Sequence, residues 1–559
     1  MKVVVLGGTG VFGSRLAELL VRDGQDVTIA ARDLKRAEAL ARRLGARAIR
    51  VDLGSDLAPL WAEAPDAVVD AAGPFHAYGA DPWRLPRACI ARGINYLDLA
   101  DEAEFCAGIA TLDGAAKAAG TFALSGVSSV PALSSAAVDA LAKGMDRLEE
   151  IDTAILPGNR APRGRSVVGA ILARTGTPFR LWQGAAWEER RGWSDPRAYR
   201  LGPGLHRRGY LIEVPDTRLF PARFGAHSVS FRAGLELPVM NAGLALLSRL
   251  RAATGIAVGP RIVALTRGMA LMLWPFGSAQ GGMVVRVIGR KDGGLIRAEW
   301  RLLAEAGAGP YVPAIAARAI LRAASRIPSG AGPALTMLPL AEFEAAMADL
   351  SIGFSRDNHP VQPLFPAHLG VAFKELPGAV RRSHDWAGCF RLDGRATVTR
   401  GRGLAARLVA AIFRFPPEGA DVPVRVTKRA APDGEIWERD FGGRIFRSYL
   451  ARRRGAITER FDPFTFVIGL TVRDGALHFP VAGGWLGPLP LPRVLMPVSI
   501  ATETEDEGGF RFDVELRAPL GLGLIVRYRG RINPRENSSR FGIDDEKLAN
   551  PADSSRQNP

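Results

Sequence analysis

Short apolar runs alternate with helix-like segments along the first 150 residues. The runs consist mostly of small or β-branched residues, and the segments between them repeat Ala and Leu at helical spacing. The expected strands are Val3–Leu6, Asp26–Ala31, Ala46–Asp52, Ala67–Ala72, Tyr96–Leu99 and Thr121–Ser125. This alternation predicts an α/β domain over residues 1–150, built as a Rossmann-type doubly wound parallel sheet.

The pattern changes between residues 151 and 354. Gly282–Gly289 and Leu295–Ala304 alternate apolar and polar residues, as half-solvated antiparallel strands do. Pro313–Ser325 is rich in alanine and predicts a helix. We expect an inserted α+β substrate domain over 151–354, followed by a linker at 354–364, where Ser355–Pro360 is polar and turn-forming.

Strand-like runs separated by Gly or Asp turns continue from residue 363 to residue 533. Their regular spacing predicts a β-rich C-terminal domain, either an antiparallel sandwich or a half-open barrel. Residues 534–559 are rich in Asn, Ser, Asp and Pro, which predicts a disordered tail.

A glycine-rich turn follows the first expected strand. Gly8, Gly10 and Gly13 have the spacing Gly-x-Gly-x-x-Gly, and a helix is expected from Ser14 to Arg22. Such glycines permit a tight turn, a close approach of backbone to a diphosphate, and close packing of helix on strand. The amides at the start of the helix then face the phosphates. The expected cofactor-binding residues are Gly7, Gly8, Thr9, Gly10, Val11, Phe12 and Gly13, with Arg32, Asp52, Ala72, Gly73 and Pro74 from later strand ends.

The residue after the second strand reports on the cofactor. An acid there holds the ribose 2′-hydroxyl of NAD, whereas this chain has Arg32, which favours the 2′-phosphate of NADP. The neighbouring Asp33 is an alternative ribose ligand, and an Arg-Asp pair that opens the next helix is another interpretation. NADP is therefore the expected cofactor, with NAD as the alternative. Asp52, at the end of the third strand, is placed to reach the adenine.

Two side chains after the fourth strand are candidates for proton transfer. His76 and Tyr78 lie in the loop where nicotinamide would meet substrate, and His76 has the more suitable intrinsic pKa. Packing of aromatic side chains in the loop is the alternative. Asp98 and Glu102 are candidates for binding a substrate ammonium, although helix capping explains Asp101 or Glu102 equally well.

Composition narrows the class of protein. A chain of 559 residues holds about two or three domains. Its three cysteines are too few for a disulfide framework or a four-ligand zinc site, so we expect no metal and a cytoplasmic location, and the sequence opens on a strand instead of a secretory signal. The net charge of +16 comes from dispersed arginines without a nucleic-acid-binding motif, so the expected partner is a small-molecule substrate and not a nucleic acid.

Two apolar segments and the oligomeric state stay open. Ile262–Phe276 is interrupted by Arg267, and Leu520–Val526 is too short to span a bilayer. We expect no transmembrane segment; a buried helix and a peripheral membrane contact both account for such segments. The chain is also compatible with a homodimer.

Several motifs together resemble the saccharopine dehydrogenase-like, or saccharopine reductase-like, NADP-binding proteins. They are Gly7–Gly13, Arg32, Ala71–Phe75 with Tyr78 and Gly79, Cys89–Asp98, Glu102 and Ser125–Pro131. Residues 394–403, 413–417 and 435–444 resemble a bacterial domain of unknown function that is fused behind such proteins.

This resemblance implies an NADP-dependent oxidoreductase, a dehydrogenase or reductase. Its hydride would pass to or from an imine or amino-acid-type substrate, or to or from an enoyl, lipid-like substrate. The resemblance favours Tyr78 as the proton donor and implies that the helix after Gly309–Tyr311 returns to the first domain. The alternative is a non-catalytic protein that senses a nucleotide or binds an apolar ligand.

Overall fold

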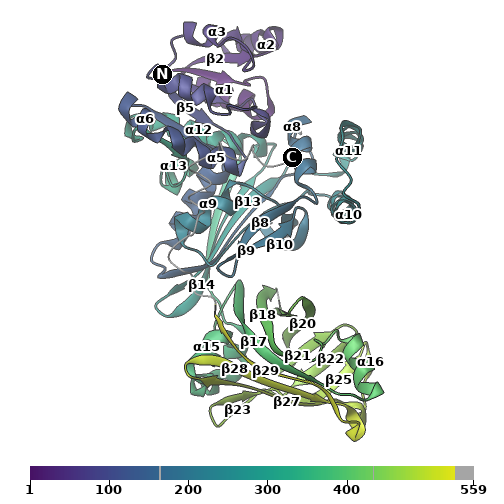
Figure 1. Cartoon of the computed structure of the whole chain (residues 1–559). Helices are drawn as coiled ribbons and strands as arrows, with labels where there is room; N and C mark the ends of the chain where they lie inside the picture. The colour runs from purple at the N-terminus through teal and green to yellow at the C-terminus, as the bar shows by residue number, and fades with distance from the viewer. Residues whose placement is uncertain (163–164, 432, 535–559) are drawn as a thin grey trace, which may run out of the picture. The chain divides into compact units, whose positions relative to one another are not determined.

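The structure is a computed structural model that describes residues 1–162, 165–431 and 433–534. It divides the chain into two compact units, Met1–Gln362 and Pro363–Pro559 (Figure 1). The expected tail at 534–559 lies outside the described residues except for Pro534, which ends the last strand.

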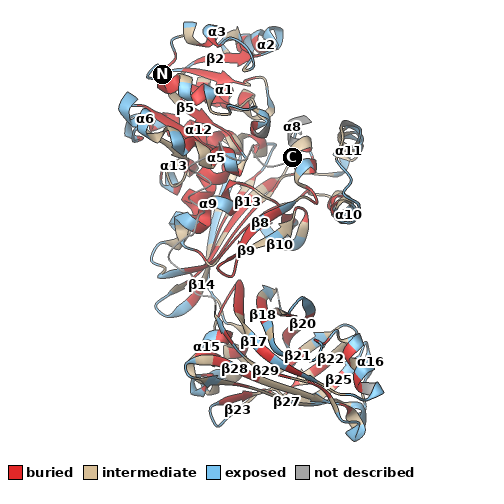
Figure 2. Cartoon of the chain, in the orientation of Figure 1, coloured by how far each residue is buried: buried red, intermediate tan, exposed pale blue. Residues whose placement is uncertain are grey.

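A parallel sheet of seven strands forms the nucleotide-binding part of the first unit. Its strand order is β15-β6-β5-β4-β1-β2-β3. The strands are β1 (Lys2–Leu6), β2 (Asp26–Ala31), β3 (Arg47–Arg50), β4 (Ala67–Asp70), β5 (Asn95–Asp98), β6 (Phe122–Ser125) and β15 (Gly330–Pro333). Most residues of β1, β2 and β4 to β6 are buried, as parallel strands covered on both faces are (Figure 2). The sheet confirms the predicted Rossmann-type fold.

Helices connect strands β1 to β6 in sequence, and one more follows β6. They are α1 (Val11–Arg22), α2 (Leu34–Leu44), α3 (Ala58–Ala62), α4 (Arg84–Ile90), α5 (Ala103–Gly108), α6 (Asp113–Ala119) and α7 (Ser134–Ala142). Helix α1 begins at Val11, three residues before the predicted start at Ser14, because the turn between β1 and α1 is shorter than expected.

A mixed sheet forms the middle of the first unit, in the order β10-β11-β12-β7-β13-β14-β16. Its strands are β7 (Arg147–Leu156), β10 (Ser194–Gly202), β11 (Leu205–Leu211), β12 (Ser228–Ala233), β13 (Gly281–Lys291), β14 (Gly294–Ala304) and β16 (Ile352–Pro360). Strands β7 and β12 are parallel, and the other pairs are antiparallel. A hairpin of β8 (Pro178–Gln183) and β9 (Ala186–Arg191), with α8 (Arg165–Arg174) and α9 (Pro215–Phe224), accompanies this sheet.

The predicted linker at 354–364 is wrong for most of its length. Residues Ile352–Pro360 form β16, an edge strand paired with β14. The polar side chains of β16 are tolerated because an edge strand is largely solvated and because Asp357 pairs with Arg301 of β14. The expectation of half-solvated strands is also wrong for β13, where residues on both faces are buried.

The chain returns to the nucleotide-binding sheet after β14. Helix α12 (Val312–Arg322) packs against α1, and β15 then adds a parallel strand beside β6. Helix α13 (Leu340–Ala345) follows. Strand β15 has the sequence Gly-Ala-Gly-Pro and gave no strand signal, so the return includes an element that the sequence did not indicate.

The apolar segment Ile262–Phe276 is not a buried helix. It forms α11 (Pro260–Met272) and a short 3₁₀ turn, after α10 (Pro238–Thr254). Leu265, Met269, Met272 and Phe276 are each more than half exposed. The structure has no helix, among the residues that it describes, with the length and hydropathy needed to cross a membrane.

The second unit contains one antiparallel sheet of thirteen strands, which confirms the predicted β-rich fold. The order is β23-β24-β27-β28-β29-β17-β18-β19-β20-β21-β22-β25-β26. The strands are β17 (Cys389–Arg400), β18 (Gly419–Ala431), β19 (Gly434–Phe441), β20 (Arg444–Arg453), β21 (Ala456–Phe461), β22 (Phe464–Ile468), β23 (Thr471–Arg473), β24 (Ala476–His478), β25 (Val481–Leu486), β26 (Leu489–Pro490), β27 (Val498–Asp506), β28 (Gly509–Arg517) and β29 (Leu524–Pro534). Helices α14 (Leu364–Leu369), α15 (Gly378–His384) and α16 (Leu404–Ile412) accompany the sheet.

Candidate functional site

The turn between β1 and α1 leaves no room for side chains at two of its glycines. A Cβ atom on Gly7 would lie 2.5 Å from the Cα atom of Ala72, and Gly7 has a φ of 67°. A Cβ atom on Gly13 would lie 2.4 Å from the carbonyl oxygen of Gly7. The Gly10 amide donates to the Gly7 carbonyl at 2.8 Å, which closes the turn. The packing therefore requires glycine at 7 and 13.

This turn suits a diphosphate. Helix α1 starts with Gly10 as its N-cap residue, and no side chain caps the helix. Its first turn contains no acidic residue that would compete with an anion. Gly10 is exposed, while Thr9, Val11 and Phe12 are half-buried, so backbone amides at the start of the helix are accessible. The residues present fit the phosphates of a dinucleotide.

Arg32 and Asp33 have different environments at the end of β2. The Asp33 carboxylate caps α2 by accepting a hydrogen bond from the Arg36 amide at 3.2 Å. Arg32 is exposed and has no hydrogen-bond or ion-pair partner within the described part of the chain. Lys35 and Arg36, which the sequence reasoning did not single out, are exposed in the first turn of α2. The end of β2 thus presents cations, while its one carboxylate is occupied.

Asp52 lies two residues beyond the end of β3, in a turn. It is exposed, and its carboxylate accepts a hydrogen bond from the Gly54 amide at 3.1 Å. Ala72, Gly73 and Pro74 lie in the loop after β4, and Ala72 packs against Gly7. The structure therefore brings the Gly7 turn and the loop after β4 together, while Asp52 stands in the loop after β3.

Tyr78 is held by a buried carboxylate. Its hydroxyl donates to Asp70 at 2.9 Å, and its ring packs against Phe75 and Phe105. Burial and the neighbouring Asp70 charge raise the pKa of Tyr78 well above its usual range. His76 lies in the 3₁₀ turn Phe75–Ala77, and its side chain is outside the part that the structure describes.

Asp70, which sequence reasoning missed, ends β4 as Asp98 ends β5. Both side chains are fully buried. Asp70 accepts from the Ala72 amide at 2.9 Å, and one oxygen of Asp98 accepts from the amides of Ala100 and Gly126 and from the Ser125 hydroxyl. Burial raises the pKa of Asp70 to about 6 and that of Asp98 to about 7. An aspartate at the end of each of two consecutive buried strands was the available signal.

A cavity of about 200 Å³ lies between the loop after β5 and the elements α8 and β8. Glu102, Arg174 and Glu213 are its charged lining residues. The Glu102 carboxylate caps α5 by accepting from the Phe105 amide at 2.6 Å, as the capping interpretation predicted. Arg174 pairs with Asp101 at 3.0 Å, so its charge is already compensated.

Glu213 gives this cavity its acidic character. Burial raises the pKa of Glu213, and the Arg174 charge offsets part of that increase while Glu102 adds to it. The two glutamates thus leave the cavity with negative charge. Its chemistry suits a cationic group of a ligand.

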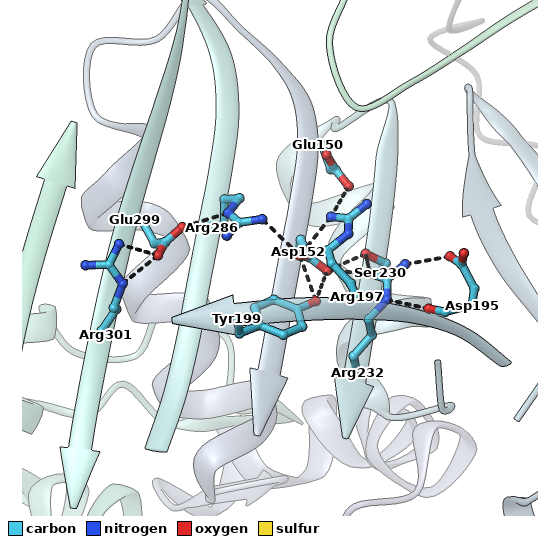
Figure 3. A network of polar contacts seen from close by, with 10 residues as sticks. All are labelled: Glu150, Asp152, Asp195, Arg197, Tyr199, Ser230, Arg232, Arg286, Glu299 and Arg301. Atoms are coloured by element: carbon cyan, nitrogen blue, oxygen red, sulfur yellow. Dashed lines mark hydrogen bonds and ion pairs between the residues drawn. The ribbon is translucent and has the colours of Figure 1, made fainter. Parts of the chain in front are cut away.

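The middle sheet contains a second cluster of charged side chains (Figure 3). Asp152 of β7 is fully buried and accepts hydrogen bonds from Arg197, Tyr199, Ser230 and Arg232 at 2.7 to 3.0 Å. Although burial opposes ionisation, the surrounding guanidinium groups hold the pKa of Asp152 below its usual range. Because Arg197 and Tyr199 belong to β10, the cluster fixes β10 against the sheet. Its hydrogen bonds are satisfied within the fold, which indicates a structural role.

Neither metal ligation nor thiol chemistry is indicated in the residues that the structure describes. They contain no cluster of three or more His, Cys, Asp or Glu side chains suited to a metal ion. Cys89, Cys106 and Cys389 are buried, and burial raises the pKa of both Cys89 and Cys106.

Comparison with known proteins gives two family matches. Residues 3–124 match the saccharopine dehydrogenase NADP binding domain, and residues 376–532 match a domain of unknown function, DUF4166. No curated protein matches the chain significantly.

Solved structures give weaker similarities. Apo saccharopine dehydrogenase (L-Glu forming) from Saccharomyces cerevisiae is 14% identical with a TM-score of 0.48, over 64% of this chain and 99% of that one. A putative short-chain oxidoreductase from Thermus thermophilus is 36% identical with a TM-score of 0.12, over 13% of this chain and 36% of that one. The family matches confirm the resemblance found in the sequence and indicate a nicotinamide cofactor. The chain therefore carries a saccharopine dehydrogenase NADP-binding domain at residues 3–124 and a DUF4166 domain at residues 376–532.

Proposed function

We propose that this protein is an NADP-dependent oxidoreductase that transfers hydride between the nicotinamide and a carbon–nitrogen bond of an amine or imine substrate. The observation that carries the proposal is the glycine turn at Gly7–Gly13, which matches an NADP-binding domain and leaves no room for a Cβ atom at two positions. When bound, the cofactor supplies the hydride. The chain supplies the grip on the phosphates and the pocket for the substrate.

The choice of NADP over NAD depends on Arg32. Its guanidinium is exposed without a partner among the described residues, whereas the Asp33 carboxylate caps α2. An arginine pairs well with a phosphate, and an occupied carboxylate is a poor ligand for a ribose hydroxyl. Lys35 and Arg36 add positive charge near the same strand end.

The acidic cavity supports an amine or imine substrate over an enoyl, lipid-like one. Glu102 and Glu213 line it, and the charge of Arg174 is compensated by Asp101. An ammonium or iminium group would be stabilised there, whereas an acyl chain would gain nothing from the two carboxylates.

Tyr78 is a weaker candidate for proton transfer than the resemblance implies. Its hydroxyl donates to Asp70, and its raised pKa opposes release of the proton. Glu213 lies in the acidic cavity, and burial moves its pKa toward neutral pH, which suits a group that takes up and releases a proton. We therefore assign Glu213 the proton exchange with the substrate nitrogen, and Tyr78 a positioning role for the loop after β4.

Cofactor titration tests the proposal. NADPH should bind the full chain saturably, and Arg32→Ala should weaken NADPH at least about tenfold more than NADH, because only NADPH carries the 2′-phosphate. Asp33→Ala is the matched control: loss of the cap should cost about 1 kcal/mol of stability and leave the preference for NADPH intact. Equal loss of both cofactors in Arg32→Ala would contradict the NADP assignment.

A turnover assay separates this proposal from its alternative. Oxidation of NADPH with an imine or of an amino acid with NADP⁺ should appear in a panel of substrates that also contains enoyl compounds. Saturable NADPH binding without turnover across that panel would favour a nucleotide-sensing protein. Turnover of enoyl compounds alone would contradict the assignment of the acidic cavity.

A further inference from the structure

The second unit contains a partly open cavity of about 170 Å³, lined by strands of its sheet and by Val409 of α16. This volume is comparable to engineered protein cavities of about 150 Å³ that bind benzene. Most of the lining is aromatic or aliphatic, with Phe415, Phe466 and Phe512 as examples. Such a cavity fits an apolar group, and it belongs to a unit without any proposed part in hydride transfer.

The charges in this cavity balance one another. Lys428, Arg439, Glu459 and Glu503 are the charged lining residues. Lys428 donates to the Ser383 carbonyl at 2.8 Å, Arg439 pairs with Glu459 at 3.0 Å, and Glu503 pairs with His384 at 2.5 Å. The lining thus has two cations and two carboxylates, and each of the four has a partner in the fold. A charged ligand would therefore find no unpaired group of opposite charge. A neutral ligand fits best.

Helix α16 separates this cavity from the surface. Val409 lines the cavity from one side of the helix, and so does Phe413, the residue that follows the helix. On the other side, Leu404, Leu408 and Ile412 are 84%, 64% and 54% exposed. These three residues are spaced by four, so they form one stripe along the helix. A helix with apolar residues on both sides is unusual where one side faces water.

Other exposed apolar residues adjoin α16 and form, with its stripe, what we call the apolar rim: Leu404, Leu408, Ile412, Leu489, Val494 and Leu520. Contacts join the segments that carry them. The Gly401 amide donates to the Ile525 carbonyl at 3.1 Å, next to the 3₁₀ turn Pro519–Gly521 that contains Leu520.

On the other side of the rim, the rings of Phe413 and Phe464 lie 5.3 Å apart, and Phe464 pairs with Leu486 of β25. The turn Arg493–Leu495 packs against Pro519–Gly521 and completes the rim. In Figure 1, α16 and β25 lie at the same end of the C-terminal sheet.

The charge around the apolar rim is positive. Residues 400–417, 479–502 and 518–524 contain no Asp or Glu. Arg402, Arg407, Arg414 and Arg493 are exposed, with no ion pair in the described ranges. Asp462, in the turn after β21, is paired with Arg460 at 3.2 Å. Exposed apolar side chains interspersed with unpaired arginines complement an anionic lipid surface.

We propose that the second unit docks on an anionic lipid surface through the apolar rim and takes up one neutral, long-chain apolar molecule, whose end enters the cavity behind α16. The rim supplies the contact with the membrane. The balanced interior selects a neutral ligand such as a long-chain alcohol or ester over a fatty-acid anion.

Vesicle flotation of the full chain tests the docking. The protein should float with phosphatidylcholine vesicles that contain phosphatidylserine, and binding should weaken in high salt. Leu408→Glu should reduce binding at least about tenfold, because it places a charge in the membrane contact. Val371→Glu is the matched control: Val371 is 81% exposed and lies outside the rim, so binding should stay unchanged.

Two results would overturn the docking surface. Vesicle binding that persists in Leu408→Glu would assign the contact to another surface, such as α11. If the wild type does not bind vesicles and Leu408→Glu changes the oligomeric state of the protein, the rim is an interface between copies of the chain.

A displacement assay without vesicles tests the cavity. N-phenyl-1-naphthylamine, a neutral apolar fluorophore, should bind the full chain, and hexadecanol should displace it at a concentration at least about tenfold below that of palmitate. Ala501→Trp and, as a second variant, Val514→Phe fill the cavity and should lower probe affinity at least about tenfold. Ile500→Trp, on the same strand but not among the lining residues, is the control and should leave affinity unchanged. Unchanged probe binding in folded Ala501→Trp and Val514→Phe, or preference for palmitate, would overturn the assignment.

Discussion

Asp70 and Asp98 are paired in register at the ends of adjacent parallel strands β4 and β5, and both are fully buried. Each accepts backbone hydrogen bonds from the loop that follows its strand. The pair thereby fixes the two loops that border the proposed nicotinamide site. The hydrogen bonds favour the charged carboxylates, but burial outweighs them and raises both pKa values.

The raised pKa of Asp98 predicts that the first unit loses stability as the pH rises. Its pKa is about 7 in the folded protein against an ordinary value of 3.8, so the folded state binds more protons than the unfolded state between these values. The free energy of unfolding should therefore fall by about 4 kcal/mol between pH 4 and pH 8 through this group. Asp98→Asn should remove the contribution of this group and leave the smaller contribution of Asp70, whose pKa is raised to about 6. Urea unfolding across this range measures the difference.

Asp139→Asn is the control for this measurement, because Asp139 is exposed on α7. It should leave the pH dependence of unfolding unchanged. A wild-type slope that persists in Asp98→Asn would show that another group carries it.

Gly13→Ala should abolish tight NADPH binding. The new Cβ atom would lie 2.4 Å from the Gly7 carbonyl oxygen, so the turn that holds the diphosphate must shift. We expect the affinity for NADPH to fall at least about a hundredfold, measured by fluorescence titration. Gly114→Ala in α6 has open space around its Cβ atom and should bind NADPH normally, with stability raised by about 0.5 kcal/mol. Normal NADPH affinity in Gly13→Ala would contradict the proposed cradle.

The sequence predicted the nucleotide-binding sheet well because buried parallel strands are continuous apolar runs. The observed β2 has the predicted bounds. Strand β5 begins and ends one residue earlier than predicted, and β6 begins one residue later. The pairing of Asp70 with Asp98 was not predictable, because it depends on which strands become neighbours in the sheet.

Other errors have a common physical origin. β16 appeared to be a linker because an edge strand needs little apolar surface, and its polar residues find partners on β14 and α13 only in the folded protein. The α11 segment was compatible with a buried helix because an apolar sequence does not show whether other parts of the chain pack over it, and in the structure several of its apolar residues are exposed. The cavity behind α16 likewise depends on the curvature of thirteen strands, which no local pattern encodes.

Glu213→Gln should weaken substrate binding and stabilise the folded protein. Burial and Glu102 disfavour the Glu213 carboxylate, so its removal should stabilise the protein more at pH 8 than at pH 5. The same change should lower kcat, because the amide cannot exchange the proton with the substrate nitrogen, and should raise the KM for an amine substrate at least about tenfold, because the cationic group loses a partner. Glu104→Gln is the control, since Glu104 is 76% exposed and should alter neither quantity. A lower melting temperature at pH 8 with an unchanged KM would contradict the role given to Glu213.

Arg318 joins α12 to α1, and its removal should destabilise the first unit strongly. Its side chain is 3% exposed and pairs with Asp23 at 2.7 Å and with Asp349 at 2.5 Å. Arg318→Ala would leave the buried Asp23 carboxylate with Arg322 alone, which should cost about 3 kcal/mol in urea unfolding at pH 7.

Although burial opposes ionisation, the hydrogen bonds and charges of Arg318 and Arg322 lower the pKa of Asp23 to about 2. This stabilisation is complete above about pH 5 and is lost as the pH falls toward 2, so the difference between wild type and Arg318→Ala should shrink from pH 6 to pH 3. Arg326→Ala breaks an exposed pair with Glu342 and should show no measurable effect, whereas equal losses in both variants would mean that burial of Arg318 contributes nothing.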